Sequence, residues 1–213
     1  MKRLLLVLLL FVPFGLNAAE TQEPGPEEIV QNTSTKVLEI LNKDVLALQD
    51  DPVEVERLVD EILLPVIDFN AFSKLTLGHN WRMATAEQRQ RFINEFKGML
   101  IRTYTKYLVD YSGTNVRMLP NKAQQHDPRR RTVITEVSRP GKAPLAVSYS
   151  FWFNKGNWKA YNLTVAGLSL VHLFRTDFNR EIDQTNLDAL ISKLSNTNRD
   201  AAKKKDREPG SAP

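Results

Sequence analysis

The chain of 213 residues contains no cysteine. This excludes a disulfide framework, a thiolate metal site, a thiol nucleophile and lipid attachment to a cysteine that follows a signal sequence. A domain built from this chain must therefore fold on its hydrophobic core alone. Hydrophobic residues make up 42% of the sequence, which is ordinary for a globular protein and sufficient for one sizeable domain.

Motifs of metal and catalytic sites are also missing. The three histidines, His79, His126 and His172, are far apart, and none has a second histidine at helical spacing. The sequence has no glycine-rich phosphate loop and no Gly-x-Ser-x-Gly nucleophile elbow. We therefore expect no metal, no cofactor and no catalytic residue.

The longest apolar run, Leu4–Val12, is too short to span a bilayer. Lys2 and Arg3 precede it, and the small residues Ala18 and Ala19 follow it. A charged start, a short apolar middle and a small-residue end are typical of a secretory signal peptide. We expect residues 1–19 to be removed and, because no cysteine can be lipidated, the mature protein to be free in the periplasm.

Positive charge is in slight excess, with 29 basic and 25 acidic residues. Removal of Lys2 and Arg3 leaves a net charge of +2, and the segment 199–213, with five basic and three acidic residues, accounts for all of it. The folded part is thus near neutral. The sequence pI of about 9.3 is therefore no argument for nucleic-acid binding, which requires a basic face on the domain itself.

Apolar spacing predicts helices first, strands second and helices last. Helices are expected over residues 27–48, 51–63, 69–77 and 85–111, and again over 170–182 and 187–194. Asp68 is predicted to cap one of them, Gly78 to end it, and Thr85 with Gln88 to form a capping box on the next.

Between these helices the apolar period changes to two. Strands are predicted at Asn115–Leu119, Thr132–Arg139, Leu145–Phe153 and Trp158–Val165, with a tight hairpin turn at 154–157. The fold class is therefore α+β, with one antiparallel sheet of about four strands packed by helices. Residues 20–195 form the expected domain, and the polar, basic tail 196–213 is expected to be disordered.

One strand has a strongly apolar side. Its alternate residues are Leu145, Val147, Tyr149, Phe151 and Phe153. The next strand is expected to place Tyr161, Leu163 and Val165 on one face. These side chains either fill an ordinary core or line a cavity, because periodicity does not distinguish the two.

Several motifs resemble the MlaC family, the toluene-tolerance periplasmic proteins of the maintenance-of-lipid-asymmetry pathway. The first group is Leu64, Pro65, Asp68 and Phe69; Leu77, Gly78, Trp81 and Arg82; Thr85, Gln88, Arg89 and Phe92; and Arg102, Thr103 and Tyr104. The second group is Val147–Tyr149, Trp158–Tyr161 and Gly167–Val171, followed by Phe174, Arg175 and Phe178. The resemblance extends from about Glu27 to Leu194.

This resemblance implies a non-enzymatic carrier that holds the acyl chains of a phospholipid between sheet and helices, with the headgroup at the mouth. It also implies a monomer that exchanges lipid with an outer-membrane lipoprotein complex and an inner-membrane ABC-type transporter through transient contacts. The residues expected to contact lipid are Phe69, Phe72, Leu75, Met99, Tyr104, Leu108, Val147, Tyr149, Phe151, Tyr161, Leu163 and Val165.

Two other function classes stay open on the residues alone. A small enzyme with an apolar pocket would need an acid or base inside it, for which Asp110, Glu136 and Asp177 are the candidates. A periplasmic adaptor would have a filled core and no ligand. The triplet 129–131, three arginines at an expected turn, is either a solvated hairpin tip or a contact for anionic headgroups or a partner.

Overall fold

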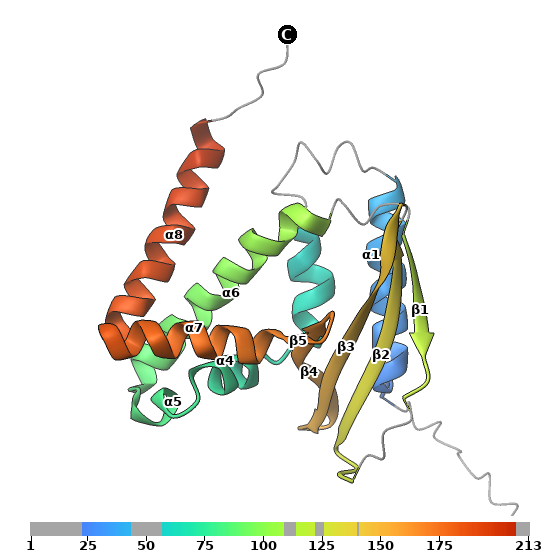
Figure 1. The fold of residues 1–213 in the computed structure, drawn as a ribbon, viewed down its shortest axis with the longest axis horizontal. Helices are drawn as coiled ribbons and strands as arrows, with labels where there is room; N and C mark the ends of the chain where they lie inside the picture. The colour runs from blue at the N-terminus through green and yellow to red at the C-terminus, as the bar shows by residue number, and fades with distance from the viewer. Residues whose placement is uncertain (1–22, 44–56, 109–113, 122–125, 140, 208–213) are drawn as a thin grey trace, which may run out of the picture.

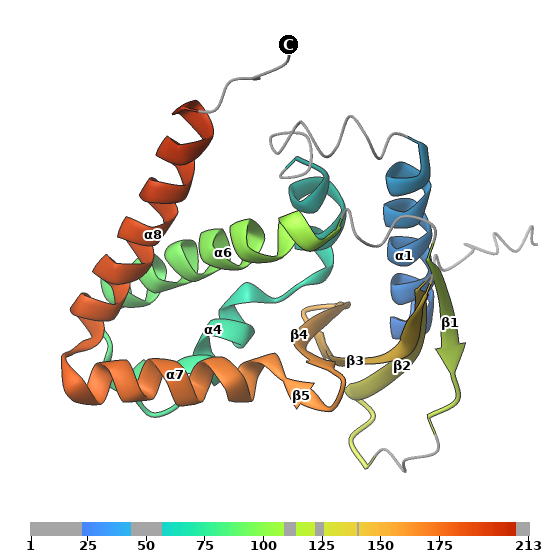
Figure 2. The ribbon, with the colours of Figure 1, turned by 45° about the horizontal axis from the view of Figure 1, so that its top comes forward.

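The computed structural model describes residues 23–43, 57–108, 114–121, 126–139 and 141–207, and of residues 104–108, 139 and 201–207 it describes the backbone alone. Within these residues the elements follow the order helix, sheet, helix, so the predicted α+β class is confirmed. In Figures 1 and 2, α1 lies beside β1 and β2, whereas α4, α6, α7 and α8 lie beyond β4. The expected signal peptide, 1–19, falls outside the described residues.

Five antiparallel strands form the sheet in the order in which they occur along the chain. They are β1 (Asn115–Leu119), β2 (Arg130–Arg139), β3 (Lys142–Asn154), β4 (Asn157–Val165) and β5 (Leu168–Ser169). The four predicted strands are confirmed. The additional strand, β5, has only two residues and was too short to show an alternating pattern.

The predicted apolar side of β3 is buried at Val147 and Phe151 but not at Phe153, and we call the sheet face that carries it the inner face. Val133 on β2 lies opposite Tyr149, and both belong to a cluster with Phe151. Ile29 and Val30 of α1 (Pro26–Lys43) complete this cluster from above the sheet. The helix predicted over 27–48 is thus confirmed as far as Lys43, and residues 44–48 fall outside the described residues.

A β-bulge changes the expected facing of β4. Ser150 pairs with Asn162 but Phe151 pairs with Ala160, so Tyr161 is an extra residue on β4. The ring of Tyr161 lies 5.9 Å from that of Trp152, which is on the outer face. The prediction that Tyr161 shares a face with Leu163 and Val165 is therefore wrong, because one inserted residue reverses the alternation.

The chain returns from α1 to the sheet through two short, irregular helices. A π-helical turn, η1 (Val59–Leu63), is followed by a 3₁₀ turn, η2 (Leu64–Val66), which contains Pro65. A short helix was predicted up to Leu63, but not its π geometry. Ile67 then forms a parallel bridge with Ala160, and the backbone N–H of Asp68 donates to the Ala160 carbonyl at 2.8 Å.

Helix α4 (Phe69–Leu77) has the predicted ends. The Asp68 carboxylate accepts a hydrogen bond from the backbone N–H of Ala71 at 2.8 Å, which is an N-cap. Gly78 ends the helix with a φ of +58°, a conformation that glycine adopts without a Cβ clash. A four-residue helix, α5 (Asn80–Met83), follows and was not predicted.

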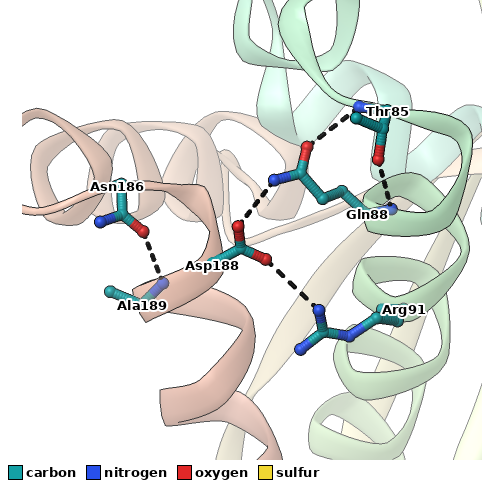
Figure 3. Close-up of polar contacts among 6 residues, drawn as sticks. All are labelled: Thr85, Gln88, Arg91, Asn186, Asp188 and Ala189. Atoms are coloured by element: carbon teal, nitrogen blue, oxygen red, sulfur yellow. Dashed lines mark hydrogen bonds and ion pairs between the residues drawn. The ribbon is translucent and has the colours of Figure 1, made fainter.

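The remaining helices, α6 (Ala86–Leu108), α7 (Leu170–Gln184) and α8 (Leu187–Arg207), pack around a core of phenylalanines. Figure 3 shows how the first turns of α6 and α8 are joined. Thr85 and Gln88 form the predicted capping box, with reciprocal hydrogen bonds of 3.0 and 3.1 Å. Asp188 then accepts hydrogen bonds from Gln88 at 2.8 Å and from Arg91 at 3.3 Å.

Helix α8 differs from the disorder expected after residue 195. It continues through Arg207, and the Asn198 side chain is only 7% exposed. Its amide donates to the carbonyl of Glu95 on α6 at 3.0 Å and to the Glu95 carboxylate at 2.6 Å. Polar composition suggested disorder, but the Asn198 side chain is buried against α6 and its amide nitrogen is hydrogen-bonded within the fold.

Candidate functional site

The described residues form three hydrophobic clusters, of which the smallest surrounds Leu41 on α1 and the two larger ones flank the candidate site. The helical cluster contains Phe72, Leu77, Phe92, Phe96 and Phe178, together with residues of α8. The sheet cluster lies between α1 and the inner face. A side chain surrounded by protein atoms has almost no accessible surface, whereas one that lines unfilled space keeps some. Large apolar residues that are only half-buried therefore keep surface that neighbouring protein atoms do not cover.

Three expected lipid-binding residues of the sheet meet this criterion. Tyr149 pairs with Leu163, and Val147 pairs with Val165, so all four point to the inner face. Tyr149, Leu163 and Val165 are half-buried. Val147 is buried, and Phe151, on the same face, is 1% exposed within the sheet cluster. Tyr149, Leu163 and Val165 therefore keep accessible apolar surface on the inner face, while Phe151 is enclosed in the core.

The helical residues divide in the same way. Phe69, Leu75 and Met99 are partly buried and pack against the edge of the helical cluster. Phe72 is 6% exposed, and its ring lies 5.4 Å from that of Phe96 in an edge-to-face contact. Phe72 thus leaves little surface for a ligand. The structure does not describe the side chains of Tyr104 and Leu108.

The expected lipid contacts left out four partly buried residues of the sheet cluster. Val66, Met118, Trp158 and Ala160 pack against its buried members. Met118 lies opposite Thr135 on β2, so the alternation of β1 could have located it if the pairing register had been known. Val66 had no such signal, because a 3₁₀ turn lacks the period of a helix or a strand.

Polar contacts join the two clusters at defined points. Lys97 of α6 pairs with Asp60 of η1 at 3.6 Å, and the Lys159 ammonium of β4 donates to the Pro65 carbonyl at 2.7 Å. Asp68 accepts a hydrogen bond from the indole of Trp152 at 3.1 Å. These contacts fix the 57–68 segment between the helices and the sheet, beside the half-buried apolar residues.

The candidate acids for an enzyme lie elsewhere. Glu136 pairs with Arg117 at 2.9 Å on the outer face, and Asp177 pairs with Arg180 at 3.7 Å on an exposed side of α7. Asp110 falls outside the described residues. All three histidines are exposed, and the described residues contain no group of three or more side chains suited to hold a metal ion. Neither Glu136 nor Asp177 thus lies beside the half-buried apolar residues of the inner face.

A pocket of about 260 Å³ opens where β1 and β2 meet the start of α1, and Glu27, Met118 and Thr132 contribute to its lining. Ligand pockets commonly measure roughly 300–1,000 Å³, so this space alone is small for a lipid with two chains. Among the helices that the structure describes, none combines the length and the apolar character needed to cross a membrane.

Comparison with known proteins gives consistent relatives. The family model described as MlaC protein matches residues 31–196. Toluene tolerance protein ttg2D of Pseudomonas putida is 33% identical over 180 residues, which cover 84% of this chain and 80% of that protein. The intermembrane phospholipid transport system binding protein MlaC of Haemophilus influenzae is 24% identical over 176 residues, which cover 81% of each chain.

A solved structure is similar as well. The phospholipid-binding protein from Ralstonia solanacearum, determined at 1.53 Å in complex with a phospholipid, matches with a TM-score of 0.76 and 27% identity. The match covers 84% of this chain and 99% of that one. The fold therefore agrees with that of this solved structure, and the family model and the relatives together show that the chain belongs to the MlaC family.

Proposed function

We propose that this chain is a periplasmic phospholipid carrier that moves lipid between the outer and inner membranes and so maintains outer-membrane lipid asymmetry. The observation that carries this proposal is the structural likeness to a protein crystallised with a phospholipid. The match covers 84% of this chain and 99% of that protein. The name of the Haemophilus influenzae relative, which places it in an intermembrane phospholipid transport system, supports the same function.

The proposed lipid site lies between the inner face of the sheet and the helices. Half-buried Tyr149, Leu163 and Val165 would contact the acyl chains from the sheet, and Phe69, Leu75 and Met99 from the helices. Acyl chains there would cover the apolar surface that these six side chains leave accessible. The phosphate headgroup would stay at the mouth, because the described apolar region offers no buried charge to pair with it.

Enclosure of the chains is a thermodynamic requirement. Two acyl chains expose about 30 methylenes, each worth ~0.8 kcal/mol when buried, so free lipid in water is less stable by roughly 20 kcal/mol or more. A bilayer offers the chains a similar environment, so transfer between membrane and carrier is close to balanced. Direction would come from partners, for which we propose an outer-membrane lipoprotein complex and an inner-membrane ABC-type transporter. No covalent bond changes in this cycle.

Native mass spectrometry tests the proposal. The mature protein is purified from periplasm without detergent, and its mass is measured before and after solvent extraction. A discrete added mass that resolves into phospholipid is the expected result. A bare polypeptide that also takes up no lipid from vesicles would contradict the proposal and favour a ligand-free adaptor.

A further inference from the structure

Three consecutive arginines lie at the end of the sheet where β2 begins. Arg130 pairs with Trp152, which brings this end of β2 beside the β3–β4 hairpin. The hairpin turns at Lys155 and Gly156, both with positive φ, as a two-residue turn requires. We call this end of the sheet the cationic tip, and it comprises Arg129, Arg130, Arg131, Lys155 and Lys159 with the aromatic residues Trp152, Phe153, Trp158 and Tyr161.

Aromatic rings and guanidinium groups are paired on both sides of the cationic tip. On the outer face, Arg130 lies over the Tyr161 ring at 5.9 Å. On the inner face, Arg131 lies over the Trp158 ring at 5.9 Å, and that ring is 5.4 Å from Phe153. Stacking on a ring holds each guanidinium without neutralising its charge. Phe153 is 40% exposed, so this apolar ring keeps surface beside the cations.

Two carboxylates that the structure describes, Asp127 and Asp68, bond to residues of the cationic tip. Asp127 pairs with Arg130 at 3.5 Å and with Arg129 at 3.8 Å, and it accepts a hydrogen bond from the backbone N–H of Arg129, so it shapes the turn. Asp68 accepts from the Trp152 indole. Even with both carboxylates included, positive side chains outnumber negative ones by five to two, although most of the domain's charges balance.

We propose that the cationic tip docks the protein on the anionic headgroups of a bilayer, at a surface separate from the acyl-chain site. Guanidinium groups bind phosphate oxygens in a bidentate manner, and Trp and Tyr rings favour the headgroup level of a membrane. Exposed Phe153 at the hairpin would enter the interface between the cations. The combination of an excess of cations over carboxylates, amphipathic rings and an exposed apolar residue beside the hairpin turn suits a flat lipid surface. Docking would concentrate and orient the carrier at the membranes it serves.

Vesicle co-sedimentation of the mature chain tests this proposal. The probes are vesicles of phosphatidylcholine alone and of phosphatidylcholine mixed with phosphatidylglycerol, at low and at high salt. The tip variant carries Arg129→Gln, Arg130→Gln and Lys155→Gln. The matched control carries Lys36→Gln, Lys74→Gln and Lys142→Gln, three exposed lysines away from the tip that remove the same charge. Circular dichroism checks that both variants are folded, and the single variant Arg129→Gln provides a milder change.

The wild-type protein and the control are expected to bind the phosphatidylglycerol vesicles, and salt should weaken this binding. The tip variant should bind about 10- to 100-fold more weakly, and Arg129→Gln alone by about fivefold. Equal binding by the tip variant and the control would overturn the proposal. Absence of wild-type binding at low salt would also overturn it and favour an acidic protein as the partner of the tip. Bound lipid measured by native mass spectrometry should not change in the tip variant, so failure of docking is distinguishable from failure of the carrier function.

Discussion

Asp68 and Trp152, 84 residues apart, are joined by a hydrogen bond of 3.1 Å from the indole N–H to one carboxylate oxygen. The other oxygen of the same carboxylate accepts from the backbone N–H of Ala71 at 2.8 Å. One side chain thus caps α4 and fastens it to β3. The predicted role of Asp68 as a helix cap is confirmed, and its second contact connects α4 to the outer face of the sheet.

Replacing Asp68 by Ala should therefore destabilise the protein by more than the loss of a cap. A cap contributes about 1 kcal/mol and a hydrogen bond to a charged group about 1.5–3 kcal/mol, so a loss of about 2–4 kcal/mol in the free energy of unfolding is expected. Urea denaturation measures it. Asn186→Ala is the matched control, because Asn186 caps α8 at 2.9 Å and should lose only about 1 kcal/mol. Equal losses would mean that the contact with Trp152 contributes nothing.

Leu163→Gln should lower lipid occupancy without unfolding the protein. Leu163 is half-buried on the inner face opposite Tyr149, where an amide would meet acyl chain without a hydrogen-bond partner. A penalty of about 1–3 kcal/mol corresponds to about 5- to 150-fold weaker retention of lipid. Native mass spectrometry measures the occupancy, and Leu168→Gln, at a residue that is 68% exposed, is the control. Full occupancy in both variants would remove Leu163 from the site.

Two truncations test the extent of the folded domain. A chain that ends at Ser195 lacks the buried Asn198 amide, which donates to Glu95 on α6, and should lose about 1–3 kcal/mol of stability. A chain that ends at Asp200 keeps this contact and should stay within about 0.5 kcal/mol of the full chain. Thermal unfolding compares the stability of each truncated chain with that of the full chain. Bound lipid should be unchanged in both, and its loss would place the end of α8 in the site.

Arg175→Lys should weaken the attachment of α7 to α4. The Arg175 guanidinium donates from two nitrogens to the Leu75 carbonyl in the last turn of α4, which otherwise lacks a partner within the helix. A lysine supplies one flexible ammonium in place of the planar fork, so a loss of about 1–2 kcal/mol is expected in urea denaturation. Arg180→Lys, in an exposed ion pair with Asp177, should change stability by less than about 0.5 kcal/mol. A similar loss in both variants would contradict the role given to Arg175.

Local sequence patterns were sufficient to predict most of the helices and strands. The cap at Asp68, the capping box at Thr85 and the alternation of β3 depend on side chains a few residues apart, and each was predictable from the sequence. The α+β class follows from the same local periods because they order the helices and strands along the chain. The family resemblance likewise depends on motifs that are continuous in sequence.

Tertiary structure alone decided which apolar residues remain half-buried. Phe151 and Tyr149 share one face of β3, yet Phe151 is enclosed by α1 and Val133 while Tyr149 keeps accessible surface. The bulge that turns Tyr161 to the outer face depends on how β3 pairs with β4, and the order of α8 beyond Ser195 depends on Glu95 about 100 residues away. Periodicity shows which side of a helix or strand is apolar. Whether that side is fully buried depends on which other helix or strand packs against it. That partner comes from distant parts of the chain, so only the folded structure separates the core from the wall of a site.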